Sequence, residues 1–215
     1  MKKGLILALM VLITMVAVPS VHAIAMLDYS FTSNHITGST DTGPFGTVSL
    51  TQDENDVDFV VTLTDAFFIR TGAGGGSNFV FNGSDVILSD ISGTGLTATD
   101  TSINPPGGQP IHADGAGNFT FGVFFTDQGT TGASDPYAGP ITFTVINATI
   151  EDFIQPNLKG NIFAADILLG DSYTGKGLTG VVDVEGPPTV PEPASLLLLG
   201  SCLIGLWAVR KKFKK

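Results

Sequence analysis

Short apolar runs alternate with turn-forming residues between Met26 and Gly186, and this alternation constrains the fold more than any other feature. In Val57–Thr64, every second residue is a large apolar one. A two-residue period predicts a β-strand with one buried face, so Phe59 should point inward and Val60 outward. Asp53–Asp56, just before it, predicts a hairpin loop. No long stretch combines a 3.6-residue period with helix-forming composition, so we expect an all-β domain.

The pattern predicts eight or nine strands. The candidates are Met26–Phe31, Gly46–Gln52, Val57–Thr64, Asn78–Phe81, Val86–Ser89, Asn118–Thr126, Ile141–Thr149, Ile162–Leu168 and Gly177–Val184. One helical turn is expected at Glu151–Ile154, and a flexible loop at Gly72–Gly76. So many short strands favour two packed antiparallel sheets. Fourteen of the 15 Phe residues lie between Met26 and Pro193, and the only cysteine is Cys202, so the core must form without an intrachain disulfide. We therefore predict a single antiparallel β-sandwich ectodomain at 26–186, flanked by an N-terminal signal helix and a C-terminal transmembrane helix.

Residues 1–25 have the pattern of a secretory signal peptide. Lys2 and Lys3 precede an apolar run, Leu5–Val18, and small residues suitable for cleavage occur at Ala23 and Ala25. A helix of this run would be roughly 21 Å long, which is short of a hydrocarbon core of about 30 Å. A cleaved signal is therefore favoured over a permanent anchor, with cleavage after either alanine.

The other end has three parts in a fixed order. A Pro-rich spacer at 187–193 contains Pro191, Glu192 and Pro193, and the uncharged run Ala194–Val209 follows. This run is apolar on all sides, which indicates a transmembrane helix and not a buried amphipathic helix of the folded domain. Five of the last six residues are basic, and Arg210, Lys211 and Lys212 form a stop-transfer signal that should stay in the cytoplasm.

These three parts together resemble the PEP-CTERM sorting tail of exported bacterial proteins. The resemblance implies that an exosortase-type processing enzyme in the cytoplasmic membrane recognises Pro191, Glu192 and Pro193. It also implies a Gram-negative host that makes exopolysaccharide, which would be a possible partner. The precursor would cross the membrane once with its C-terminus inside. The mature form would be secreted or held at the cell surface.

The charge distribution excludes one class of partner. The stretch from Met26 to Pro193 has three basic side chains and all twenty acidic ones, which gives a net charge of −17. Such a surface repels phosphate backbones, so we expect no binding to nucleic acid.

One acidic segment suggests a metal. Asp53, Asp56 and Asp58 lie close together in sequence, and Ca²⁺ takes six to eight oxygen ligands. No EF-hand spacing is present, and the alternative is a solvated turn that keeps a sheet edge soluble. Calcium is the only cofactor that the sequence suggests.

Residues for catalysis are sparse. His35 and His112 are the only histidines beyond the signal segment, and neither has another His or a Cys at ligand spacing. The only Trp is Trp207, so no pair of carboxylates is enclosed by Trp sugar platforms. We expect a structural or interaction protein of the cell surface or exopolysaccharide matrix, and not an enzyme. The alternatives are a calcium- or carbohydrate-binding adhesin and, third, a secreted hydrolase.

Overall fold

The computed structural model describes residues 25–100, 110–126, 128, 132–171 and 176–185, and the strands among these residues pair in antiparallel fashion throughout. The strands are β1 (Met26–Ser30), β2 (Ser33–Asn34), β3 (Gly46–Asp53), β4 (Asp56–Leu63), β5 (Ala66–Phe68), β6 (Phe79–Phe81), β7 (Ile91–Ser92), β8 (Leu96–Asp100), β9 (Ile111–Ala113), β10 (Gly117–Phe119), β11 (Phe121–Phe125), β12 (Ile141–Val145), β13 (Asn161–Asp171) and β14 (Lys176–Glu185). Four short 3₁₀ turns, η1 (Gly72–Gly74), η2 (Leu88–Asp90), η3 (Gly132–Ser134) and η4 (Ile150–Phe153), join them.

Several predicted segments lie outside the described residues. These are the signal peptide up to Ile24, the spacer at 187–193, the helix Ala194–Val209 and the basic tail Arg210–Lys215. Within the part of the chain that is described, no helix has the length and apolar character needed to cross a membrane.

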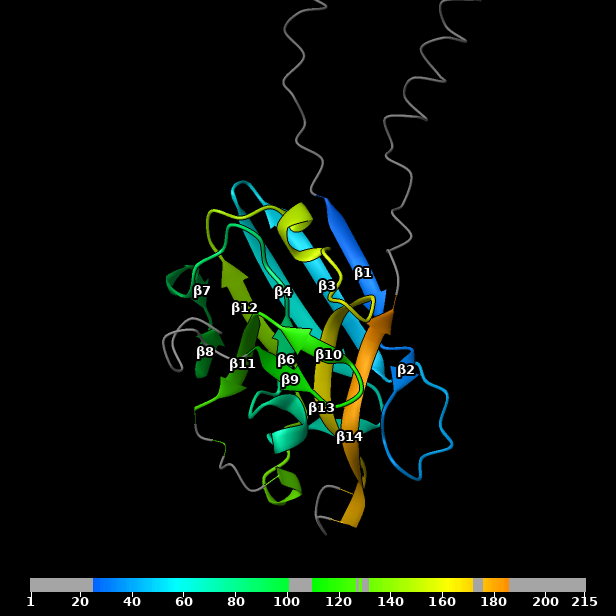
Figure 1. Ribbon diagram of the computed structural model, residues 1–215. Coiled ribbons are helices and arrows are strands. Elements are labelled where there is room, and N and C mark those ends of the chain that lie inside the picture. The colour runs from blue at the N-terminus through cyan, green and yellow to red at the C-terminus, as the bar shows by residue number, and fades with distance from the viewer. Residues whose placement is uncertain (1–24, 101–109, 127, 129–131, 172–175, 186–215) are drawn as a thin grey trace, which may run out of the picture.

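Two sheets make the sandwich (Figure 1). Sheet A has the strand order β1-β3-β4-β12-β7, and sheet B has the order β2-β14-β13-β6-β11-β8, with β5 paired to β13. A third, two-stranded unit consists of β9 and β10, which we call the cap hairpin (Ile111–Phe119). The all-β antiparallel fold predicted from the alternation is therefore confirmed.

The alternation also gives the correct register in sheet A. Strand β4 pairs with β3 from Gly46↔Leu63 to Asp53↔Asp56, so the predicted loop is a tight turn in which Glu54 has a φ of +52°. Phe59 is 1% exposed and Val60 is 39% exposed, as the two-residue period requires.

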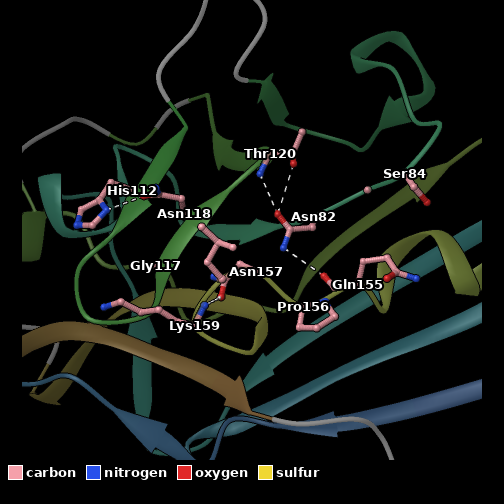
Figure 2. A pocket seen from close by; sticks show the side chains of 12 residues that line it. Asn82, Ser84, His112, Gly117, Asn118, Thr120, Gln155, Pro156, Asn157 and Lys159 are labelled. Atoms are coloured by element: carbon pink, nitrogen blue, oxygen red, sulfur yellow. Dashed lines mark hydrogen bonds between the residues drawn. The ribbon is translucent and has the colours of Figure 1, made fainter.

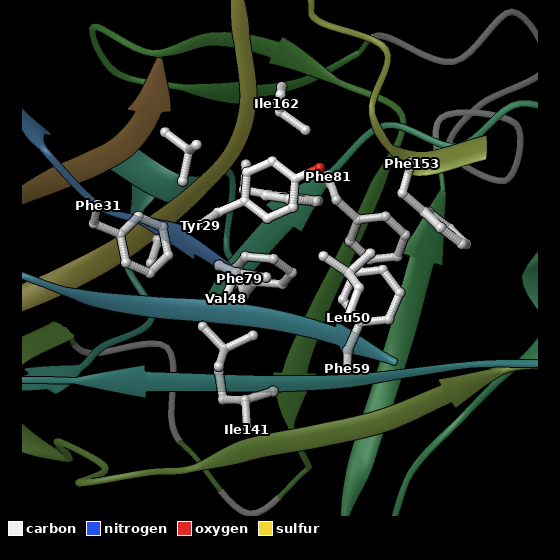
Figure 3. Close-up of a cluster of buried hydrophobic side chains, with 14 of the residues drawn as sticks. Tyr29, Phe31, Val48, Leu50, Phe59, Phe79, Phe81, Ile141, Phe153 and Ile162 are labelled. Atoms are coloured by element: carbon white, nitrogen blue, oxygen red, sulfur yellow. The ribbon is translucent and has the colours of Figure 1, made fainter. Parts of the chain in front are cut away.

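Aromatic rings from both sheets fill the space between them (Figure 3). Phe59 of sheet A stacks on Phe143 at 4.5 Å between ring centroids and meets Phe81 of sheet B at 5.5 Å. Phe153, in the turn η4, packs edge-on against Phe59 at 4.9 Å. The helical turn expected at Glu151–Ile154 therefore exists, and it carries a core residue.

A β-bulge in β13 adjusts which side chains enter this core. The pairing with β14 advances by three residues on β13 and two on β14, from Asn161↔Glu185 to Ala164↔Asp183. As a result, the consecutive residues Ile162 and Phe163 both belong to the core between the sheets. Asn161 is buried with Ala116 and Asp183 on the other side of sheet B.

The cap hairpin covers part of the outer face of sheet B. Its small side chains Ala113 and Ala116, together with Phe119, form a second buried cluster with residues of β6, β13 and β14. Those residues are Val80, Ala164 and Val181. Sheet B is thus buried on both faces in this region, whereas sheet A is buried on one.

Two predicted strands differ from the structure. Val86–Ser89 is not a strand, because the Asp90 carboxylate accepts from the backbone N–H of Ile87 and closes the turn η2. Asn118–Thr126 is two strands, β10 and β11, because the Thr120 N–H and hydroxyl both donate to Asn82 and break the ladder there. The Gly72–Gly76 loop contains the turn η1. Strands β2, β5, β7, β8 and β9 were not expected, and each has only two to five residues.

Candidate functional site

The predicted calcium ligands all emerge on the outer face of sheet A. Asp53 and Asp56 are direct cross-strand partners, and Asp58 lies opposite Thr51. Asp56 accepts from the Asn147 N–H at 3.1 Å, and Asp58 accepts from the Thr144 hydroxyl at 2.6 Å. Across the described residues, no group of three or more His, Cys, Asp or Glu side chains is arranged to hold a metal ion. A calcium site at this hairpin stays a prediction.

Each described histidine contacts a different carboxylate. His35 Nε2 lies 2.8 Å from Asp183 Oδ2, and His112 Nε2 lies 3.4 Å from Asp114 Oδ1. His112 also uses Nδ1 to contact the Asn118 amide oxygen at 2.9 Å. The His35 ring sits against Gly115, where a Cβ would come within 2.1 Å of the ring, so only glycine fits at this point of the cap hairpin.

Two buried carboxyl groups, which the sequence reasoning missed, lie on the outer face of sheet B: Asp183 next to the cap hairpin, and Asp166 beneath the segment that contains η1. We call Asn161, Asp166 and Asp183 the polar layer. Asp183 is fully buried and accepts from the Asn161 amide at 2.8 Å in addition to contacting His35. Asp166 is 1% exposed and accepts from both the N–H and the hydroxyl of Thr71.

Burial raises the pKa of both carboxyl groups. Loss of solvent raises the pKa of Asp166 to about 6, although the hydrogen bonds from Thr71 act in the opposite direction. Burial also raises the pKa of Asp183, and the contact with His35 partly offsets the rise. The sequence signal for both was an acid in an apolar strand, at the position where the alternation points away from the core between the sheets.

A groove of about 590 Å³ runs beside the cap hairpin (Figure 2). Its walls come from β10, from the loop after β6 and from the loop Gln155–Lys159. Asn82, Asn118, Gln155 and Asn157 all line it, so we call it the amide groove. This volume lies within the range of about 300–1,000 Å³ that is usual for small-molecule sites.

Two of the amides hold the walls in place. Asn82 accepts from Thr120 and donates to the Gln155 carbonyl at 3.3 Å, which joins two of the walls. Asn157 donates to the Ala116 carbonyl of the cap hairpin at 3.0 Å and accepts from the Lys159 N–H at 2.9 Å. Lys159 in turn donates from Nζ to the Gly115 carbonyl at 2.7 Å. The groove is therefore built by contacts between segments that are far apart in sequence.

A second cavity, of about 450 Å³, lies between η1 and β8. The guanidinium of Arg70, which lines this cavity, already has partners within the fold. The Arg70 guanidinium stacks at 3.5 Å on the ring of Phe124, and it donates to the carbonyls of Gly76 and Gln128. Arg70 is thereby held as a structural link between loops.

Comparison with known proteins identifies the C-terminal segment. Residues 189–212 match the family described as the PEP-CTERM protein-sorting motif. No curated protein and no solved structure matches the chain. The matched segment includes Pro191, Glu192 and Pro193 and reaches the basic residues Arg210, Lys211 and Lys212. The chain is therefore an exported protein with a PEP-CTERM sorting motif, a substrate for an exosortase-type processing enzyme, and its ectodomain is an all-β sandwich.

Proposed function

We propose that the chain is a structural and interaction protein of the cell surface or exopolysaccharide matrix, and that it has no enzymatic activity. The match of residues 189–212 to the sorting motif carries the location in this proposal, because the motif directs a chain to the cell envelope. The acidic surface supports it, since a strongly charged domain stays soluble outside the cell.

Removal of the tail is the first test. In a host that has an exosortase, mass spectrometry of the wild-type chain should find a mature C-terminus near Pro193, and the mature protein should be recovered with the matrix fraction. Glu192→Ala and Pro193→Ala should leave full-length precursor in the inner membrane, because an enzyme pocket reads the shape and charge of these residues. Scrambling Leu196–Leu206 is the matched control and should leave maturation intact, since lipid responds to hydrophobicity more than to residue order. A mature wild-type chain that keeps Lys215 would contradict the proposal.

Membrane topology is the second test. A reporter enzyme that is active only outside the cytoplasm should be active when fused after Gly186 and inactive when fused after Lys215, because basic residues stay inside. Deleting Arg210–Lys215 should weaken the stop-transfer signal, so that part of the precursor is translocated completely across the membrane. The reverse activities of the two fusions would rule out sorting from the outer side of the membrane.

The second candidate function is a carbohydrate-binding adhesin. One observation favours it over the secreted hydrolase: the amide groove offers hydrogen-bonding side chains in a walled depression, and none of the residues that line it is acidic. A glycosidase would require two carboxyl groups there.

A further inference from the structure

We propose that the amide groove binds a neutral polysaccharide chain. The inference deepens the proposed function, because it names the class of surface polymer that the exported domain would contact. It rests on the composition of the groove, on the rigidity of its walls and on the charge of the ectodomain around it.

The side chains that line the groove match the chemistry of sugars. An amide presents both a donor and an acceptor, and so does each hydroxyl group of a sugar. Gln155 and Asn118 are exposed in the groove, and in the described structure neither the Gln155 amide nor Asn118 Nδ2 has a hydrogen-bond partner. Pro156 and the fully exposed Leu158 add apolar surface next to them, against which the C–H face of a pyranose ring would pack.

The walls of the groove are organised before any ligand arrives. The side chain of Asn82 is hydrogen-bonded to Thr120 and to the Gln155 carbonyl. The side chain of Asn157 is hydrogen-bonded to the Ala116 carbonyl and to the Lys159 N–H. A ligand therefore meets walls that are already hydrogen-bonded to one another, while the Gln155 amide and Asn118 Nδ2 remain available to it. Such preorganisation lowers the entropic cost of binding.

Charge selects a neutral ligand over an ionic one. The groove lining contains Lys159 and His112 but no acidic residue, so it offers no counter-charge to a polycation. A polyanion would approach an ectodomain (26–186) that has three basic and 19 acidic side chains, a net charge of −16, and the long-range field would repel it. An uncharged polymer rich in hydroxyl groups needs no counter-charge in the groove and is not repelled by the acidic ectodomain.

The strand at the edge of the groove disfavours a peptide ligand. Strand β10 has three residues, and Gly117 at its start has a φ of +106°. An added peptide strand needs a longer run of extended backbone for its hydrogen bonds. We therefore assign the groove to a sugar chain and treat peptide binding as an outcome of the test.

Calorimetric titration of the purified full chain tests the assignment. The protein is kept in a zwitterionic detergent, because a maltoside detergent would itself present a neutral sugar. The probes are cellohexaose, laminarihexaose, maltohexaose and chitohexaose, with a hexamer of galacturonate as the anionic comparison and a Gly-Ser hexapeptide as the peptide comparison. We expect at least one neutral hexasaccharide to bind, and to bind more tightly than the galacturonate hexamer or the peptide.

Groove variants locate the site. Gln155→Ala and Leu158→Ala change exposed side chains, so the melting temperature should not move, and each should weaken binding by about 3- to 10-fold, the usual effect of losing one hydrogen bond or one apolar contact. Thr142→Ala is the matched control, because Thr142 is exposed on the outer face of sheet A, and it should leave the Kd unchanged.

Three results would overturn the assignment: no binding of any neutral hexasaccharide, equal binding by wild type and both groove variants, or tighter binding of the anionic hexamer or the peptide. Because the titration uses purified protein, it does not depend on sorting. A chain that fails to be processed but binds the sugar contradicts the proposed function alone, and a processed chain that binds none of the sugars contradicts only the inference about the groove.

Discussion

The two interiors of this molecule, which lie on opposite faces of sheet B, follow different rules. Between the sheets, buried side chains are almost all apolar, and Phe rings supply much of the bulk. On the outer face of sheet B, beneath the cap hairpin and η1, the buried apolar residues are Ala and Val side chains and the Phe119 ring, and they lie beside the polar layer. The same strands, β13 and β14, supply both interiors through alternate residues. The first interior is filled by apolar side chains. In the second, each residue of the polar layer also buries one oxygen that has no hydrogen-bond partner in the described structure, so this interior is easier to disturb.

The largest effect that we expect is in the interior between the sheets. Phe59→Ala removes a ring that is 1% exposed and contacts Phe143, Phe81 and Phe153, so it should lower the free energy of unfolding by about 3–5 kcal/mol. Val60→Ala, one position along on the outer face, should change it by less than about 0.5 kcal/mol. Urea denaturation of the full chain measures both. If Val60→Ala cost more than Phe59→Ala, the assignment of inner and outer faces would be wrong.

The second prediction concerns the polar layer and its dependence on pH. Burial raises the pKa of Asp166 to about 6, above the ordinary value of 3.8, so the folded state binds a proton more tightly than the unfolded state does. The stabilisation of the folded state by the protonated Asp166 is therefore fully present below about pH 4, and it is lost as the pH rises through about 6. At 1.36 kcal/mol for each pKa unit, the loss is on the order of 3 kcal/mol. Asp183, whose pKa burial also raises, acts in the same direction.

Asp166→Asn is the matching variant, because an amide oxygen can still accept from Thr71 while the charge is absent. The difference in unfolding free energy between wild type and variant should shift in favour of the variant from pH 4 to pH 7, and should then stay constant. Thermal melts at a series of pH values give this difference directly. Parallel curves for the two proteins would show that Asp166 titrates alike in the folded and unfolded states.

The smallest effect is expected at carboxylates outside both interiors. Asp53 is exposed at the β3–β4 turn, so Asp53→Asn should change stability by less than about 0.5 kcal/mol, with or without millimolar Ca²⁺. Differential scanning calorimetry at both calcium concentrations provides the measurement. A rise in melting temperature with Ca²⁺ that disappears in an Asp53→Asn, Asp56→Asn double variant would instead establish the predicted calcium site.

The accuracy of sequence-based prediction also differs between the two interiors. The interior between the sheets was foreseeable, because a two-residue apolar period such as that of Val57–Thr64 identifies both the strand and its buried face. The polar layer was not, because an acid within Ile162–Leu168 looks like an ordinary solvent-facing position until another segment covers it. The amide groove was missed for a related reason: Asn82, Asn118 and Gln155 are brought together only by long-range contacts. The sequence pattern shows which residues of a strand share a face. It does not show which outer face of a sheet will be covered by a segment from elsewhere in the chain.

The bulged pairing of β13 with β14 has a mechanical consequence. Strand β14 is the last described strand before the sorting motif, and it pairs with β13 from Asn161↔Glu185 to Asp171↔Lys176, with β2 on its other side. While the precursor is tethered through its tail, tension on the ectodomain enters at the Glu185 end of β14. Near that end β14 has a second neighbour, β2, at Val182 and Asp183, whereas the edge strand β1 pairs with β3 alone. The described sandwich is thus joined to its tail through a strand that pairs with β13 over most of its length and with β2 near the end where the tail begins.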